Sequence, residues 1–182
     1  MNRKPYFRKL KGQEKCPAQD FDVCEMLLAC LGCFFTIMLI SVIDKFSHDI
    51  LSNQPLFVAP VGASSVMIFG IPTSCYAQPR NVIGGHFLSA ICGVFAYCLF
   101  PNTPIFSGAF AVFLAMGAMY GTQTIHPPGG ATALLAVIGD KRITDLGFSF
   151  AFIPCLSNAI ILVLCGMLIN NLSKKRSYPR FW

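Results

Sequence analysis

Long apolar blocks separated by short polar segments make up most of this chain. Four of these blocks cover residues 23–43, 82–100, 105–121 and 147–171. A helix rises about 1.5 Å per residue, so roughly 20 apolar residues cross the ~30 Å hydrocarbon core of a bilayer. The pattern therefore predicts four full transmembrane helices.

Two further apolar blocks, 56–71 and 131–138, are too short or too interrupted to cross a bilayer as regular helix. Prolines and glycines stand at their starts, and proline removes a backbone donor and breaks a helix. In hydrocarbon, irregular backbone persists only where protein covers it or where it lines a polar cavity. We therefore expect two short helices that begin within the membrane, with the regular part of the first at about 62–71.

The two short blocks share a sequence pattern. Residues 60–67 (PVGASSVM) align with residues 128–135 (PGGATALL), and each copy lies between two long blocks. The expected fold is all-α: a polytopic helical membrane protein with four full transmembrane helices plus two short, broken or re-entrant helices in a two-fold internal repeat. If the short segments dip in and return, there are four crossings. If they cross with an unwound portion, there are six, and the two three-helix units are inverted.

Charge is concentrated at the ends of the chain. Between residues 50 and 139 the only charged residue is Arg80, whereas basic residues crowd the segments 1–22 and 172–182. Basic clusters beside spans mark the cytoplasmic side. We therefore expect two basic cytoplasmic tails, 1–22 and 172–182, around a transmembrane domain, 23–171, in the cell (inner) membrane. The bilayer, and not nucleic acid, is the partner that this charge pattern favours.

Enzyme and metal motifs are not apparent. The nine cysteines fall mostly inside the apolar blocks, where cysteine behaves as a small hydrophobic residue. The pair Cys30 and Cys33 has no second pair at zinc spacing, so we expect no metal and no cofactor. There is no standard phosphate loop, HExxH sequence or nucleophile elbow, so we expect no enzyme. Small residues in 84–93 and 108–121 suit helix packing within one chain or in a homo-oligomer.

The two helix starts are the predicted solute site. Amide groups and the positive dipole end of a short helix would face a ligand there, which suits a small anion or a polar neutral solute. The predicted donors are the backbone around Gly62, Ala63, Gly129 and Gly130, and the hydroxyls of Ser64, Ser65 and Thr132. The alternative is that these hydroxyls only join helices to one another.

Three ionisable residues and the proline pair complete the predicted site. His86 and His126 lie in or beside spans, where a histidine binds an anion, relays a proton, or holds broken backbone in place. Pro127 and Pro128 shape the break. Arg80 suits an oxyanion at a pore mouth, or else serves as an anchor at the membrane interface.

Three motifs resemble those of the HPP family of small integral membrane proteins. They are PVGASS at 60–65, AQPRNVIGGH at 77–86 and TIHPPGGATAL at 124–134, and the resemblance runs from about residue 22 to 171. Val61 stands where the family often has Phe, and Gly129 where it often has Ala. The resemblance implies four transmembrane helices and, because some plastid and cyanobacterial members are associated with nitrite transport, a small-solute transporter.

The function we expect is therefore a transporter or channel for a small anion such as nitrite. One alternative is a channel for a neutral polar solute, which would use the same hydroxyls without Arg80. Another is a membrane scaffold or sensor that transports nothing and works through its basic tails.

Overall fold

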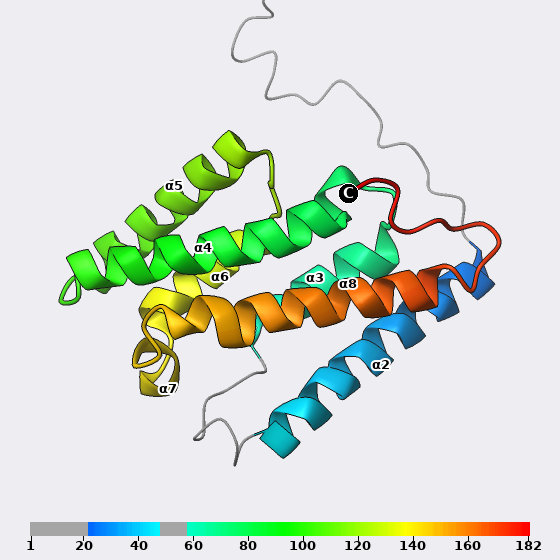
Figure 1. Ribbon diagram of the computed structural model, residues 1–182, viewed down its shortest axis with the longest axis horizontal. Helices are drawn as coiled ribbons and strands as arrows, with labels where there is room; N and C mark the ends of the chain where they lie inside the picture. Colours follow the sequence, from blue (N-terminus) through cyan, green and yellow to red (C-terminus); the bar gives the residue numbers. More distant parts are fainter. Residues whose placement is uncertain (1–21, 48–57) are drawn as a thin grey trace, which may run out of the picture.

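Helices make up all the regular structure in the part of the chain that the computed structural model describes, residues 22–47 and 58–182. Figure 1 shows α4 and α8 crossing the middle of the molecule, with α5 on one side and α2 on the other. The elements in chain order are α2 (Val23–Ser47), α3 (Pro60–Gly70), the 3₁₀ turn η1 (Cys75–Ala77), α4 (Pro79–Leu99), α5 (Pro104–Thr122), α6 (Pro128–Ile138), α7 (Lys141–Thr144), the π-helical segment η2 (Ala151–Leu156) and α8 (Ser157–Asn170).

Four helices are long and apolar enough to cross a membrane, as predicted: α2, α4, α5 and the continuous stretch Ala151–Asn170 formed by η2 and α8. Their bounds differ from the prediction. The first helix continues to Ser47, so part of the expected polar loop 44–55 is helical, and the remainder lies outside the described residues. α4 and α5 begin at Pro79 and Pro104, because the first helical position needs no N–H group.

The last long helix starts at residue 151, later than the predicted 147, and its first turns are π-helical. Pro154 lies inside this segment. Proline lacks an N–H, and its ring displaces the carbonyl four residues earlier, so a locally widened helix is the expected accommodation.

The two short helices are present and correspond to each other. α3 and α6 each contain 11 residues, and each begins at the proline of its repeat, Pro60 or Pro128. Both start slightly earlier than the sequence suggested, because proline at the first position extends the helix to the repeat boundary. Equal length and equivalent starts support the internal repeat.

Several helix ends meet at one end of the molecule, which we call the tail end. Here the start of α2 pairs with the chain that follows α8: Lys175 with Asp22, and Arg176 with Glu25. The Arg176 guanidinium also donates to the carbonyl of Phe69 at the end of α3, at 2.7 Å.

The start of α4 and the end of α5 lie at the tail end as well. Tyr178 Oη donates to the Ala77 carbonyl just before α4, at 2.8 Å, and Arg80 Nη2 donates to the carbonyl of Thr122 at the end of α5, at 2.8 Å. Successive helices therefore run in alternating directions. The unit α2–α3–α4 is antiparallel to the unit α5–α6–α8. The C-termini of α2 and α3 lie on opposite sides of the molecule.

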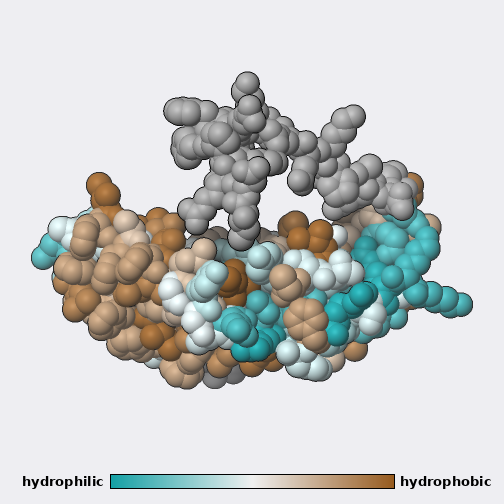
Figure 2. All heavy atoms as spheres, turned by 90° about the horizontal axis from the view of Figure 1, so that it is seen from above, coloured by the Kyte–Doolittle hydropathy of each residue, from teal (hydrophilic) through white to brown (hydrophobic). Residues whose placement is uncertain are grey.

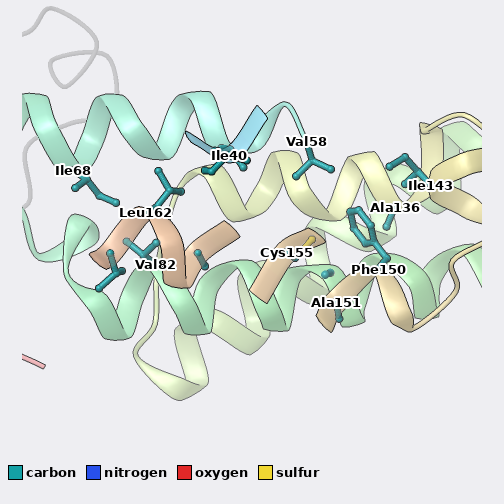
Figure 3. Packing of buried hydrophobic residues seen from close by; sticks show 14 of the residues in the cluster. Ile40, Val58, Ile68, Val82, Ala136, Ile143, Phe150, Ala151, Cys155 and Leu162 are labelled. Atoms are coloured by element: carbon teal, nitrogen blue, oxygen red, sulfur yellow. The ribbon is translucent and has the colours of Figure 1, made fainter. Parts of the chain in front are cut away.

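α4 is the central helix, packed against α5, α6 and the η2–α8 stretch. At Gly93 an added Cβ would lie 2.5 Å from the Ala133 carbonyl oxygen, so glycine allows α4 and α6 to approach closely. Figure 3 shows Ile68, Leu162 and Val82 gathered at one part of the core and Cys155, Phe150 and Ile143 at another.

The outer surface is largely apolar. Large side chains are exposed on the long helices, such as Phe34 on α2, Phe113 on α5 and Leu168 on α8. Figure 2 shows mainly hydrophobic residues over one half of the visible face, and hydrophilic residues mixed with them from the middle to the other end. An exposed apolar surface of this extent suits contact with lipid.

Candidate functional site

Four predicted site residues from three helices and a loop meet in one buried cluster: Ser64 of α3, His86 of α4, His126 of the α5–α6 loop and Thr132 of α6. Each is at most 3% exposed. Two residues 68 positions apart, Ser64 and Thr132, come from equivalent positions of the repeat. Each hydroxyl also lies near the carbonyl of its own repeat proline, Pro60 at 3.2 Å or Pro128 at 3.3 Å.

Short hydrogen bonds connect the cluster. Ser64 Oγ lies 2.7 Å from His86 Nε2 and 2.8 Å from His126 Nε2, so one hydroxyl bridges two rings. His86 Nδ1 lies 2.7 Å from Thr132 Oγ1. The two imidazole rings meet edge to face, with centroids 4.9 Å apart. We call the four residues, Ser64, His86, His126 and Thr132, the histidine cluster.

The loop that holds His126 is fixed on both sides. α5 ends at Thr122, and Gln123 adopts a left-handed backbone conformation (φ 57°) that stops the helix. Asn81 Nδ2 then donates to the Ile125 carbonyl at 2.8 Å, which attaches the loop to α4. Finally, His126 Nδ1 donates to the Tyr76 carbonyl at 2.7 Å. Pro127 and Pro128 follow, and α6 begins.

Two glycines allow these elements to approach one another. A Cβ at Gly85 would lie 2.5 Å from His126 Cβ, and a Cβ at Gly129 would lie 2.6 Å from Ser89 Oγ and 3.1 Å from the Gly85 carbonyl oxygen. Gly129, which has no side chain, therefore allows α6 to contact α4. At Gly62 and Gly130, in contrast, an added Cβ would meet nothing within 4 Å.

The prediction that backbone amides at the helix starts are free for a solute is wrong for three glycines. Gly62 N–H donates to the Ala59 carbonyl at 3.1 Å, Gly129 N–H to the His126 carbonyl at 2.8 Å and Gly130 N–H to the Pro127 carbonyl at 3.1 Å. The residue before each helix is itself helical in conformation, so a tight first turn satisfies these donors. The polar groups that remain in the cluster are side chains.

The other predicted residues lie outside the cluster. Ser65 Oγ donates to the Gly62 carbonyl of its own helix at 2.8 Å, and Ala63 is exposed on the outer side of α3. Pro127 is exposed and Pro128 is buried as the first residue of α6. Arg80 is exposed at the tail end and bonds to Thr122.

A pocket of about 560 Å³ lies beside the histidine cluster at the tail end. Arg80 and Asn81 line it, as do Tyr76, whose carbonyl accepts from His126, and Ile125, which precedes His126. Both polar and apolar groups contribute to the wall. The remaining lining residues are Cys75, Tyr120, Gln123, Phe181 and Trp182.

The sequence interpretation missed two parts of this region. Tyr76 takes part only through its backbone carbonyl, which no residue pattern reveals. Phe181 and Trp182 reach the pocket because Tyr178 and Arg180 attach the last residues to the start of α4: Arg180 N–H donates to Gln78 Oε1 at 2.8 Å. The aromatic residues of the segment 178–182 (YPRFW) were the sequence feature that could have indicated this contact.

In residues 22–47 and 58–182 no group of three or more His, Cys, Asp or Glu side chains is placed to hold a metal ion. What the arrangement offers is a set of buried side chains that hydrogen-bond to one another.

The comparisons with known proteins agree with one another. The profile of the HPP transmembrane region matches residues 18–179. A transmembrane protein of Dictyostelium discoideum is 38% identical over 97% of this chain and 63% of its own length. A second one from that organism is 36% identical over 97% of this chain and 57% of its own length. The chain thus spans about three fifths of these relatives. No solved structure matches it.

Proposed function

The chain belongs to the HPP transmembrane family and is a multi-pass membrane protein, and we propose that it transports a small anion such as nitrite across the membrane. The observation that carries this proposal is the meeting of α3 and α6, two short proline-initiated helices of antiparallel units, at a buried polar cluster. Paired broken helices in opposed repeats are typical of the central site of secondary transporters.

The alternating helix directions support a specific arrangement in the bilayer. We propose that α3 and α6 each belong to a further pass, giving six in all, with the two units inverted relative to each other. Both tails then lie on one side. Their basic residues favour the cytoplasm for that side, and the cell membrane is the membrane we propose.

The pocket at the tail end is the proposed entry for the anion. Arg80 lines it and is the only charged residue of α4, and α3, α5 and α6 have none. A fixed positive charge beside low-dielectric walls raises the local concentration of anions. The histidine cluster lies directly behind the pocket, beyond the Tyr76 carbonyl and Ile125. Packed as it is, the cluster closes the route and would have to open for passage.

The proposal is tested by flux into proteoliposomes that contain the purified full chain. Nitrite, nitrate, chloride, formate and urea are compared with protein-free vesicles as the background. The variants are Arg80→Gln and His126→Ala, with Arg142→Gln as the control. Arg142 is an exposed cation that pairs with Asp140 beside α7, away from the pocket, so its loss changes the net charge equally.

We expect selective anion flux that falls about tenfold or more in Arg80→Gln, is absent in His126→Ala, and is unchanged in Arg142→Gln. Size-exclusion profiles establish that each variant is folded. Flux of urea alone, insensitive to Arg80, would replace the proposal with a neutral-solute channel. Folded protein that moves none of these solutes would favour a scaffold or sensor that acts through its tails.

A further inference from the structure

Five polar groups form an unbroken hydrogen-bonded chain through the interior. In order they are Thr132 Oγ1, His86, Ser64 Oγ, His126 and the Tyr76 carbonyl, and the successive distances are 2.7, 2.7, 2.8 and 2.7 Å. The Tyr76 end adjoins the pocket that Arg80 lines. The Thr132 end lies in the first turns of α6.

The direction of each bond follows from the donors available. A carbonyl only accepts, so His126 Nδ1 donates to Tyr76, and in a neutral ring Nε2 must then accept. Ser64 has one hydrogen, which it gives to His126 Nε2, and its oxygen accepts from His86 Nε2. His86 Nδ1 then accepts from Thr132. Every bond is satisfied only if the two histidines hold opposite tautomers.

The same atoms accommodate one additional proton without moving. With His86 doubly protonated, Thr132 Oγ1 accepts from Nδ1 and turns its own hydrogen to the Pro128 carbonyl, 3.3 Å away. With His126 doubly protonated instead, its Nε2 donates to Ser64, Ser64 donates to His86 Nε2, and His86 Nδ1 donates to Thr132. Both arrangements contain five hydrogens and leave no bond unsatisfied.

One concerted step converts the first arrangement into the second. The His86 Nε2–H bond breaks as a new O–H bond forms at Ser64, while the original Ser64 O–H bond breaks and a new N–H bond forms at His126 Nε2. The excess proton passes from one ring to the other, and no atom is oxidised or reduced. A hydroxyl shared by two imidazoles is therefore sufficient for proton exchange.

Nothing charged in the packed elements holds the proton on one ring. α3, α5, α6, η2 and α8 contain no Asp, Glu, Lys or Arg, and Arg80 of α4 is directed to the Thr122 carbonyl. The other titratable side chains of these elements and of η1 are cysteines and tyrosines: Cys75, Tyr76, Cys92, Tyr97, Cys98, Tyr120, Cys155 and Cys165.

We propose that anion transport by this chain is coupled to a proton, which passes between His86 and His126 through the hydroxyl of Ser64. This inference rests on the proposed function. A proton that travels with the anion cancels its charge, and so lowers the cost of crossing the apolar interior. Closing the route for the anion would not require a hydrogen-bonded chain. Proton coupling gives this chain a role.

The test uses the full chain in proteoliposomes, with nitrate and nitrite as probes and protein-free vesicles as background, because nitrous acid also permeates lipid. Initial anion rates and internal acidification are followed with an acidic exterior and, separately, with a potassium–valinomycin potential. Proton-coupled one-to-one transport is accelerated by the pH gradient and indifferent to the potential. Uncoupled anion flux responds to the potential.

Three variants isolate the hydroxyl. Ser64→Ala removes it and should lower the pH-driven rate about 10²-fold, the scale of a lost positioned proton transfer. Ser64→Thr retains it and should restore the rate. The control is Ser107→Ala on α5, which removes a buried hydroxyl that has no hydrogen-bond partner among the described residues, and should keep the coupled rate.

A second measurement does not depend on transport. The sequence has only three histidines, so ¹⁵N-histidine NMR of His48→Gln in bilayers reports His86 and His126 alone. Above the ordinary histidine pKa of about 6.5, we expect one Nδ1–H and one Nε2–H tautomer. Two rings in the same tautomer would overturn the hydrogen-bonded chain.

The outcomes separate the two proposals. Anion flux driven by the potential and unaffected by the pH gradient overturns proton coupling and leaves anion transport standing. Folded protein with no anion flux overturns anion transport, and coupling with it. If Ser64→Ala keeps full pH-driven flux, transport is coupled but the proton does not pass through Ser64, and the relay is refuted.

Discussion

The adjacent glycines of the His-Pro-Pro segment provide a direct test of the helix packing, because Gly129→Ala and Gly130→Ala should have opposite effects. Both glycines lie in the first turn of α6. Alanine favours helix over glycine by up to about 1 kcal/mol, and this backbone gain is similar at the two positions. The surroundings differ: Gly129 is in contact with α4, and Gly130 has open space.

The size of the difference follows from the contacts. A Cβ at residue 129 would lie 2.6 Å from Ser89 Oγ and 3.1 Å from both the Gly85 carbonyl oxygen and Met119 Sδ. The serine can rotate, but the carbonyl belongs to the backbone of α4 and cannot move alone. Overpacking of this kind costs about 1–3 kcal/mol. Since the backbone gain cancels between the variants, their difference in unfolding free energy is that cost.

Thermal unfolding of the two variants in the same detergent measures this difference. For a chain of this length it corresponds to roughly 2–12 °C in Tm, with Gly130→Ala at or above the wild type and Gly129→Ala below it. If the two variants shift Tm equally, the close α4–α6 contact at Gly129 is refuted.

Three further predictions concern the tail end and the histidine cluster. Arg176→Ala should cost about 2–4 kcal/mol, because its largely buried guanidinium joins α2, α3 and α8. Lys175→Ala breaks an exposed pair and should lower Tm much less, so equal shifts in Tm would contradict this. The Lys175 hydrogen bond holds the pKa of Asp22 below its ordinary value. The stability that this pair contributes is therefore present above about pH 4 and is lost as pH falls further. The difference in Tm between wild type and Lys175→Ala should close on acidification. Ser64→Ala leaves two ring nitrogens unpaired, whereas Thr132→Val leaves only one. The first should therefore destabilise the protein about twice as much, roughly 2–6 against 1–3 kcal/mol. Equal losses in unfolding free energy would argue against the Ser64 hydroxyl bridging the two rings.

The long helices and the repeat could be predicted from the sequence, because each follows from the length and order of the apolar blocks. Helix bounds were less accurate where proline acts locally. Pro79 and Pro104 extend their helices toward the N-terminus, and Pro154 introduces a π-helical turn. These effects depend on how neighbouring carbonyls are placed, which an apolar pattern does not specify.

The candidate site was predicted residue by residue but not as an arrangement. Ser64, His86, His126 and Thr132 were each identified as polar residues at helix breaks, yet their contacts depend on the rotation of α3 and α6 about their axes. That rotation is set by close approaches such as Gly85 against His126. The free amides were predicted wrongly because Ala59 and Pro127 are helical in conformation, so the N–H groups of each first turn donate to carbonyls just before the helix.

The repeat and the polar chemistry have separate origins in the sequence. Ser64 and Thr132 occupy equivalent repeat positions and each lies one turn after a helix-starting proline. The histidines do not repeat: the position equivalent to His126 is Val58, which is buried, and the η2–α8 stretch that corresponds to α4 contains no histidine. One half of the pseudosymmetric centre is therefore apolar, and the other connects through Tyr76 to the pocket that Arg80 lines. An inverted repeat alone would give two equivalent half-sites, so the two histidines are what make the two halves of this centre chemically different.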